Sequence, residues 1–166
     1  MRRRLLILAT VLLATGCASS SVRTVEQGRC YRSGQLSAAA LENEIQNRKI
    51  KTVVNLRGFE PDAKWYTQER DVCKRLGVRH IDVTLDPNRP DREEILRLLD
   101  AYQTAETPLL LHSRSPSGRV GFASSLYRVT VLDQPKEQAR QEMAFWQSRN
   151  VPFAPLGRLD EFLYDW

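Results

Sequence analysis

The sequence is poor in the residues that build metal centres and nucleophilic sites. Its 166 residues include three cysteines and two histidines, and no C-x-x-C, H-E-x-x-H or G-x-S-x-G motif occurs. We therefore expect no structural zinc, no serine-hydrolase elbow, no metal and no cofactor. Internal repeats and low-complexity stretches are also missing, and the length suits one domain with a single core.

The sequence has one long apolar run, and it is too short to span a bilayer. Residues 5–14 follow three arginines, as in an export signal. The run leads through small residues into Cys17, which resembles the lipobox of bacterial lipoproteins, with Ala14 where Leu is usual. We predict that residues 1–16 are removed and that Cys17 carries lipid. An ordinary secretory signal with a chance cysteine is the alternative.

The positive charge belongs largely to this signal. The whole chain has a formal net charge of +5, and without the three arginines of residues 1–16 the charge is +2. No nucleic-acid partner is therefore expected. Residues 17–27 are polar and are predicted to form a flexible tether, followed by one domain over residues 28–166. By analogy with lipoproteins, Ala18 favours the cell envelope, at the outer membrane facing the periplasm.

From residue 28 onward, short apolar runs alternate with helical patterns. This alternation predicts an α/β fold with a central, mostly parallel sheet flanked by helices. Strands are expected at 52–56, 81–85 and 109–111, with the all-leucine strand in the centre. A first helix is expected over 38–48 behind the N-cap Ser37, and a second over about 65–76 with Trp65, Val72, Cys73 and Leu76 on one face. A third helix is expected to start at Pro90 and a fourth after residue 119. Two more are expected, one from Pro135 with Met143 and Trp146 and one over 158–164.

The two cysteines beyond the signal leave a choice open. Cys30 and Cys73 could pair in an oxidising compartment, but their spacing does not decide it. Because Cys73 lies on the apolar face of a predicted helix, we favour a buried free thiol there.

Residues 113–119 combine small polar side chains with arginine, between the central strand and the next helix. Open α/β sheets bind ligands at this position. Backbone N–H groups at a helix start and a planar guanidinium both favour an oxyanion, so a phosphate group is the expected ligand. The predicted phosphate-binding residues are Ser113, Arg114, Ser115, Pro116, Ser117, Gly118 and Arg119.

The segment 112–121 resembles the H-C-x-x-G-x-x-R-[ST]-G signature of cysteine-dependent protein tyrosine and dual-specificity phosphatases. Residues 30–36 are similar to the Y-R-S-G-Q-P opening of bacterial and atypical dual-specificity members, and residues 53–57 to their I-N-L-R strand. The resemblance covers about residues 28–132. It implies that Ser113 stands at the nucleophile position, that Arg119 binds phosphate, and that the loop is supported by His112, Gly121 and Arg57.

The family resemblance implies a mechanism that the loop of this chain does not support. In the family a cysteine thiolate attacks phosphorus, because the loop lowers the thiol pKa from about 8.5 to below neutrality. Ser113 would stay protonated there. Pro116 replaces a glycine and removes an amide donor, which costs about 1.5–3 kcal/mol if that bond was charge-assisted. Val120 replaces a hydroxyl residue that assists the departing thiolate in relatives. Natural loss of activity explains these changes better than a deliberate cysteine-to-serine substitution.

The general-acid position corresponds to Asp86, which is equally well explained as a turn residue. Asp82 is second by spacing, and Asp91 is expected to serve a helix start. His112 is expected to point inward and orient the loop, and His80 is interpreted as a core or edge residue. Arg57 either adds positive potential at the loop or pairs with Glu60 or Asp62.

Three functions remain open from the sequence. We favour a lipid-anchored pseudophosphatase that binds phosphate-bearing small molecules or phosphoproteins without efficient hydrolysis. An active phosphomonoester hydrolase, toward phosphoprotein or inositol-phosphate-like substrates, is the first alternative. An envelope interaction module with a vestigial loop is the second. The sequence leaves the ligand and the oligomeric state undetermined.

Overall fold

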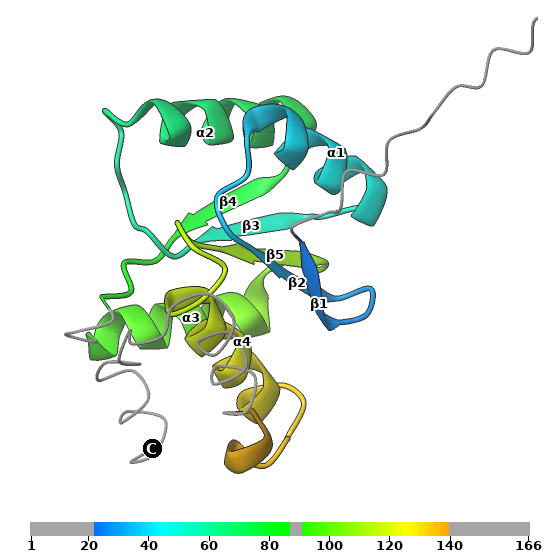
Figure 1. Cartoon of the computed structure of the whole chain (residues 1–166), viewed down its shortest axis with the longest axis vertical. Helices are drawn as coiled ribbons and strands as arrows, with labels where there is room; N and C mark the ends of the chain where they lie inside the picture. The colour runs from blue at the N-terminus through cyan, green and yellow to red at the C-terminus, as the bar shows by residue number, and fades with distance from the viewer. Residues whose placement is uncertain (1–21, 87–90, 140–166) are drawn as a thin grey trace, which may run out of the picture.

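The computed structural model describes residues 22–86 and 91–139 of the chain (Figure 1). Within these ranges, strands and helices alternate along most of the chain, as the sequence predicts. In chain order the elements are β1 (Arg23–Glu26), β2 (Cys30–Ser33), α1 (Ala38–Arg48), β3 (Thr52–Asn55), α2 (Lys64–Leu76), β4 (Arg79–Asp82), α3 (Arg92–Thr104), β5 (Leu109–His112) and α4 (Arg119–Thr130).

The five strands form one sheet in the order β1-β2-β5-β3-β4. β2, β5, β3 and β4 are parallel, and β1 joins the edge of the sheet antiparallel to β2. β5 is central and its three leucines are fully buried, which confirms the prediction for residues 109–111. In the ladder His112 lies between Ser33 of β2 and Asn55 of β3, so three strands end together at one edge.

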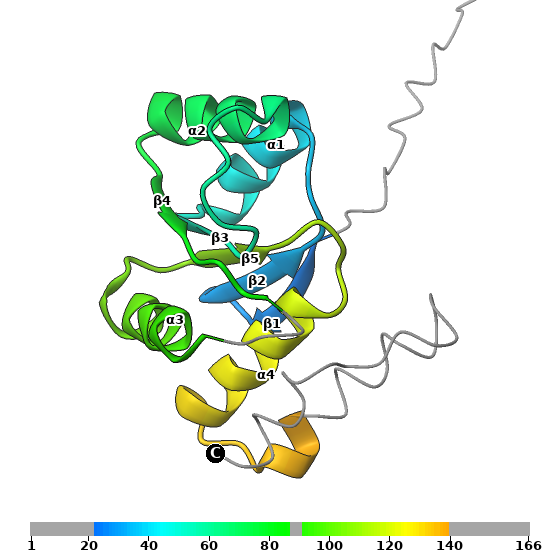
Figure 2. The ribbon, with the colours of Figure 1, turned by 90° about the vertical axis from the view of Figure 1, so that its left-hand side faces the viewer.

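Helices cover both faces of the sheet, α1 and α2 on one side and α3 and α4 on the other (Figures 1 and 2). Each face has its own buried cluster of side chains. Cys30 belongs to the cluster that contains α3 and α4, whereas Cys73 belongs to the cluster of α1 and α2. Both thiols are buried and free. The expectation of a buried free thiol at Cys73 is confirmed, because the sheet separates the two cysteines.

The predicted tether is wrong for its last residues, because β1 begins at Arg23. Val22 and Val25 are buried, and β1 pairs with β2 through a tight turn in which Gly28 has a φ of 75°. The Gly28 N–H donates to the Tyr31 hydroxyl at 3.1 Å. An edge strand of four residues carries too little apolar periodicity to stand out from a polar linker.

The helix starts and ends follow the capping signals closely. Ser37 caps α1 by accepting a hydrogen bond from the Ala40 N–H at 3.3 Å, and Gly77 ends α2 with a φ of 67°. Asp91 caps α3 through the Glu93 N–H at 2.8 Å, so α3 begins at Arg92 rather than at Pro90, which lies outside the described residues.

Three details of the packing differ from the sequence prediction. Trp65 of α2 is only half-buried, and Tyr66 and Glu69 take the inner face instead. The β4 ladder ends at Asp82, although burial keeps alternating through Leu85. α4 is buried on nearly all sides from Val120 to Tyr127, rather than on one face.

Several predictions fall on residues that the structure does not describe. These are the signal peptide with Cys17, the predicted helix with Met143 and Trp146, and the predicted segment 158–164. Residues 136–139, at the start of the predicted helix, are described and are helical. Within the described ranges, no helix has the length and apolar character needed to cross a membrane.

Candidate functional site

The predicted phosphate-binding loop lies where the sequence places it. Residues 113–118 connect the end of the central strand β5 to α4, whose first residue is Arg119. Gly118 precedes the helix with a φ of 57°, a conformation that glycine adopts without a steric penalty. The loop therefore stands at the carboxyl edge of the parallel strands, beside the ends of β2 and β3.

Ser113 is the most enclosed residue of this loop, with 1% of its surface exposed. Its hydroxyl Oγ donates to the backbone carbonyl of Ser115 at 2.6 Å. His112 turns inward, as predicted, and its Nε2 is 2.9 Å from Oε1 of Glu69. Its Nδ1 has no hydrogen-bond partner among the described residues. Among the described residues, neither histidine and no carboxylate accepts a hydrogen bond from the Ser113 hydroxyl.

The rest of the loop is held by contacts with the segment after β2. The Gln35 N–H donates to the Arg114 carbonyl at 3.4 Å. A Cβ atom on Gly34 would lie 3.2 Å from Cδ of Pro116, so this glycine permits the close approach of the two segments. The hydroxyls of Ser115 and Ser117 lie 2.9 Å apart.

Arg119 reaches back from the first turn of α4 to the end of β3. Its Nη1 donates to the Leu56 carbonyl at 3.2 Å. Burial and the nearby charge of Arg57 lower the pKa of Arg119, whereas Asp86 and Glu60 act in the opposite direction. An arginine keeps its proton under these conditions. The side chain therefore supplies a positive charge beside the loop.

Of the three candidate acids, Asp86 is the one whose charge acts on Arg119. It is exposed after Leu85. Asp82 instead accepts hydrogen bonds from Tyr66 at 2.6 Å and Asn55 at 2.8 Å. Asp91 is the α3 cap, as predicted.

Arg57 pairs with Glu60, which is one of its two predicted roles, and its charge also acts on Arg119. Its guanidinium lies 3.5 Å from the centroid of the Trp65 ring, and Nη1 donates to Oε1 of Gln35 at 2.8 Å. Nη2 is 4.0 Å from the Glu60 carboxylate. Burial lowers the pKa of Arg57, and Glu60 opposes this shift.

Glu69 was not predicted as a site residue; it is buried on α2 with 4% of its surface exposed. Oε1 accepts from Nε2 of His112 at 2.9 Å and from Nε2 of His80 at 2.8 Å, and Oε2 accepts from Gln35 at 2.9 Å. Burial by itself raises the pKa of Glu69, but these hydrogen bonds overcome it and lower the pKa to about 2. The sequence did contain an indication of its burial. Glu69 lies three and four residues before Val72 and Cys73, so it shares their buried helix face.

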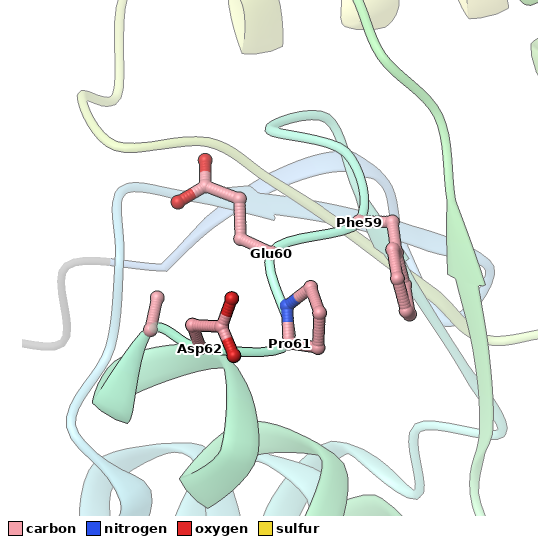
Figure 3. Close-up of a pocket in the computed structure, with 5 residues that line it drawn as sticks. Phe59, Glu60, Pro61 and Asp62 are labelled. Carbon is pink, nitrogen blue, oxygen red and sulfur yellow. The ribbon is translucent and has the colours of Figure 1, made fainter.

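The segment between β3 and α2 forms a hollow of about 410 Å³ (Figure 3), and Glu60 in its lining pairs with Arg57. Phe59, Glu60, Pro61, Asp62 and Ala63 line it. The Phe59 ring, 67% exposed, stands on the opposite side of this segment from the Glu60 carboxylate. No group of three or more His, Cys, Asp or Glu side chains suited to a metal occurs in residues 22–86 and 91–139.

A family model described as "DSP-PTPase phosphatase fused to NAD+ Kinase" matches residues 8–153. The chain is also 30% identical over 115 residues to the dual specificity protein phosphatase TpbA from two strains of Pseudomonas aeruginosa. That match covers 68% of this chain and 49% of TpbA, so the chain spans about half the length of these curated relatives.

Solved phosphatase structures share the fold at lower identity. A cysteine-to-serine variant of P. aeruginosa TpbA in complex with pTyr has a TM-score of 0.59 and 23% identity, over 90% of this chain and 99% of that chain. The core catalytic domain of the PP-IP phosphatase SIW14 from S. cerevisiae, in complex with citrate, has a TM-score of 0.69 and 15% identity, over 87% and 83%. These similarities confirm the predicted α/β fold.

Proposed function

Because the chain belongs to the family described as DSP-PTPase phosphatase fused to NAD+ Kinase, we propose that it binds phosphate-bearing ligands at residues 113–119 without hydrolysing them efficiently. The Ser113 hydroxyl is the observation that carries this proposal. The hydroxyl donates a hydrogen bond to the Ser115 carbonyl at 2.6 Å, and a carbonyl oxygen is too weak a base to remove the hydroxyl proton. An unactivated hydroxyl is a poor nucleophile toward phosphorus.

Within residues 22–86 and 91–139, neither the histidines nor the thiols replace a thiolate in this loop. His112 and His80 both direct Nε2 to Glu69. The thiols of Cys30 and Cys73 are buried in the two core clusters. Burial raises the pKa of both thiols, that of Cys73 to about 12, so neither forms a thiolate near neutral pH.

Hydrogen-bond donors and positive charge around the loop support binding of an oxyanion. Among the described residues, the backbone N–H groups of Ser115, Gly118 and Arg119 take part in no hydrogen bond. The start of α4 adds a partial positive charge. Together with the Arg119 guanidinium, these donors form the phosphate cradle, by which we mean residues 113–119.

The relatives indicate the chemical class of the ligand. TpbA, as a cysteine-to-serine variant, forms a complex with pTyr, and SIW14 is named a PP-IP phosphatase. The shared group is a phosphate on a larger molecule. We extend this class to the present chain, as a phosphorylated small molecule or a phosphoprotein.

We also propose that the chain is exported and lipid-anchored at Cys17 in the cell envelope, at the outer membrane facing the periplasm. The support is the sequence, where three arginines and an apolar run precede Ala-Thr-Gly-Cys. Phosphate binding and lipid anchoring are separate proposals, and neither depends on the other.

A test of phosphate binding and turnover uses the full chain in detergent, with an aryl phosphate as substrate and inorganic phosphate as ligand. We expect hydrolysis no faster than that of Arg119→Ala, and calorimetric binding of phosphate that Arg119→Ala weakens at least about tenfold, because a charge-assisted fork is lost. Arg97→Ala, which removes an exposed arginine of α3, serves as the matched control. Ser113→Cys should introduce measurable turnover, because a thiol can ionise in this loop.

Two outcomes would contradict the proposal in different ways. A rapid hydrolysis that disappears in Ser113→Ala would establish an active phosphomonoester hydrolase. A full chain that neither binds millimolar phosphate nor gains thermal stability from it would leave the loop vestigial, since a ligand that binds only the folded state must stabilise it.

A further inference from the structure

Glu69 is a buried carboxylate that joins separate segments of the chain. Its Oε1 accepts from Nε2 of His112 on β5 and from Nε2 of His80 on β4, at 2.9 and 2.8 Å. Its Oε2 accepts from Gln35, in the segment after β2, at 2.9 Å. A buried charge is costly unless its lone pairs are satisfied. Three donors on one carboxylate meet this requirement and fix their own side chains in return.

The hydrogen bonds of Glu69 continue to the rim of the phosphate cradle on two sides. On one side, Gln35 accepts from Nη1 of Arg57 at 2.8 Å, and its backbone N–H donates to the Arg114 carbonyl at 3.4 Å. On the other side, His112 directly precedes Ser113. The His112 carbonyl accepts a hydrogen bond from the Leu56 N–H at 2.9 Å. The Leu56 carbonyl in turn accepts from Arg119.

The direction of these bonds leaves little freedom. Arg57 and the His112 Nε2–H can only donate to their partners, and the Gln35 amide must present its oxygen to Arg57 and its NH2 group to Glu69. A carboxylate at position 69 is the group that accepts from all three donors at once. A glutamine there has one acceptor oxygen, so its NH2 group would face another donor.

We propose that Glu69 is a positioning residue of the phosphate cradle: through Gln35 and His112 it holds Arg57 and the loop in the geometry that binds a phosphate group. The inference rests on the phosphate binding proposed above. Glu69 itself stays behind the loop and does not contact the ligand. Its contribution to affinity is pre-organisation, because donors that are already in place lose less freedom when the ligand binds.

The test measures inorganic phosphate affinity by calorimetry on the full chain, well below the unfolding temperature of each variant. We expect Glu69→Gln to weaken binding about tenfold and Gln35→Ala about three- to tenfold. Gln35 is half-buried and lies in a connecting segment, so Gln35→Ala keeps the test decisive if Glu69→Gln fails to fold. Glu42→Gln is the matched control, because Glu42 pairs with Arg75 at 2.6 Å, away from the cradle.

The double variant Glu69→Gln/Gln35→Ala separates positioning from simple stability. If both residues act through one chain of hydrogen bonds, the phosphate affinity of the double variant should be within about twofold of that of the single variant that binds phosphate less tightly. Unchanged affinity in both single variants, with only their unfolding temperatures lowered, would overturn the inference, as would fully additive losses. Failure of the unaltered chain to bind phosphate would instead overturn the proposed function.

Discussion

Gly58 and Gly28 both have positive φ angles, 87° and 75°, but their surroundings differ. A Cβ atom on Gly58 would lie 2.3 Å from Oγ1 of Thr84, whereas a Cβ on Gly28 would meet nothing within 4 Å. Gly58 also presents its carbonyl to the Asn55 side chain at 2.8 Å. The segment that leaves β3 toward Arg57 and the hollow therefore depends on this glycine.

We expect Gly58→Ala to lower the free energy of unfolding by about 2–4 kcal/mol, because backbone strain and a steric clash act together. Gly28→Ala imposes the strain alone and should cost about 1 kcal/mol. Urea unfolding followed by circular dichroism gives both values. Equal losses in the two variants would mean that the Thr84 contact relaxes without cost.

The residues of the candidate site were predictable where a local pattern defines them. Ser113 and Arg119 were singled out by a small polar loop between an apolar strand and a helix, together with the resemblance of residues 112–121 to the phosphatase signature. Glu69 and Gln35 were not found, because their hydrogen-bond partners come from distant parts of the sequence, and a charged residue in a helix is ordinarily exposed. The one sequence signal for the burial of Glu69 was its spacing to Val72 and Cys73, which lie on the buried face of the same helix.

Helices and strands likewise differ in how far their local sequence predicts them. α1, α2 and α3 have capping residues and amphipathic faces that sequence periodicity detects. β1 has neither, and its strand conformation comes from pairing with β2. The all-round burial of α4 arises because β5, β2 and α3 lie against it, and such tertiary packing leaves no periodic pattern.

At the scale of the elements, Glu69 ties α2 to the sheet, and this link should make stability depend on pH. Its pKa is about 2 in the folded chain against 4.5 for an unperturbed glutamate. The ionised form therefore stabilises the fold above pH 4.5, and this contribution is lost as the pH falls from 4.5 to 2.

The unfolding free energy of the unaltered chain should fall by roughly 3 kcal/mol over that interval through Glu69 alone. Glu69→Gln removes the titrating group, so its profile should be flatter between pH 4.5 and 2, at lower stability near pH 7. Chemical unfolding at a series of pH values measures this. Glu42→Gln removes an exposed pair and should change the acid slope little. Parallel profiles for all three proteins would contradict the assignment.

For the molecule as a whole, the proposed lipid on Cys17 predicts that the chain is bound to membranes and that loss of Cys17 changes its location. The chain should fractionate with membranes, and Cys17→Ala should release it or leave it unprocessed, because the acyl chains supply the membrane affinity. Cys73→Ala is the matched control, since that thiol is buried in the domain. Recovery of the unaltered chain in the soluble periplasmic fraction would argue for an ordinary secretory signal.

The early start of β1 determines how far the proposed anchor lets the site travel. Residues 18–21 separate Cys17 from Val22, and so short a stretch extends no more than roughly 18 Å. β1 is antiparallel to β2, with Arg23 opposite Arg32, so the chain enters the sheet at the edge where the phosphate cradle stands. On a lipid-anchored chain, the cradle would sample a thin layer above the bilayer. Ligand encounters would then become a nearly two-dimensional search, which favours phosphates carried on that surface over molecules that diffuse freely.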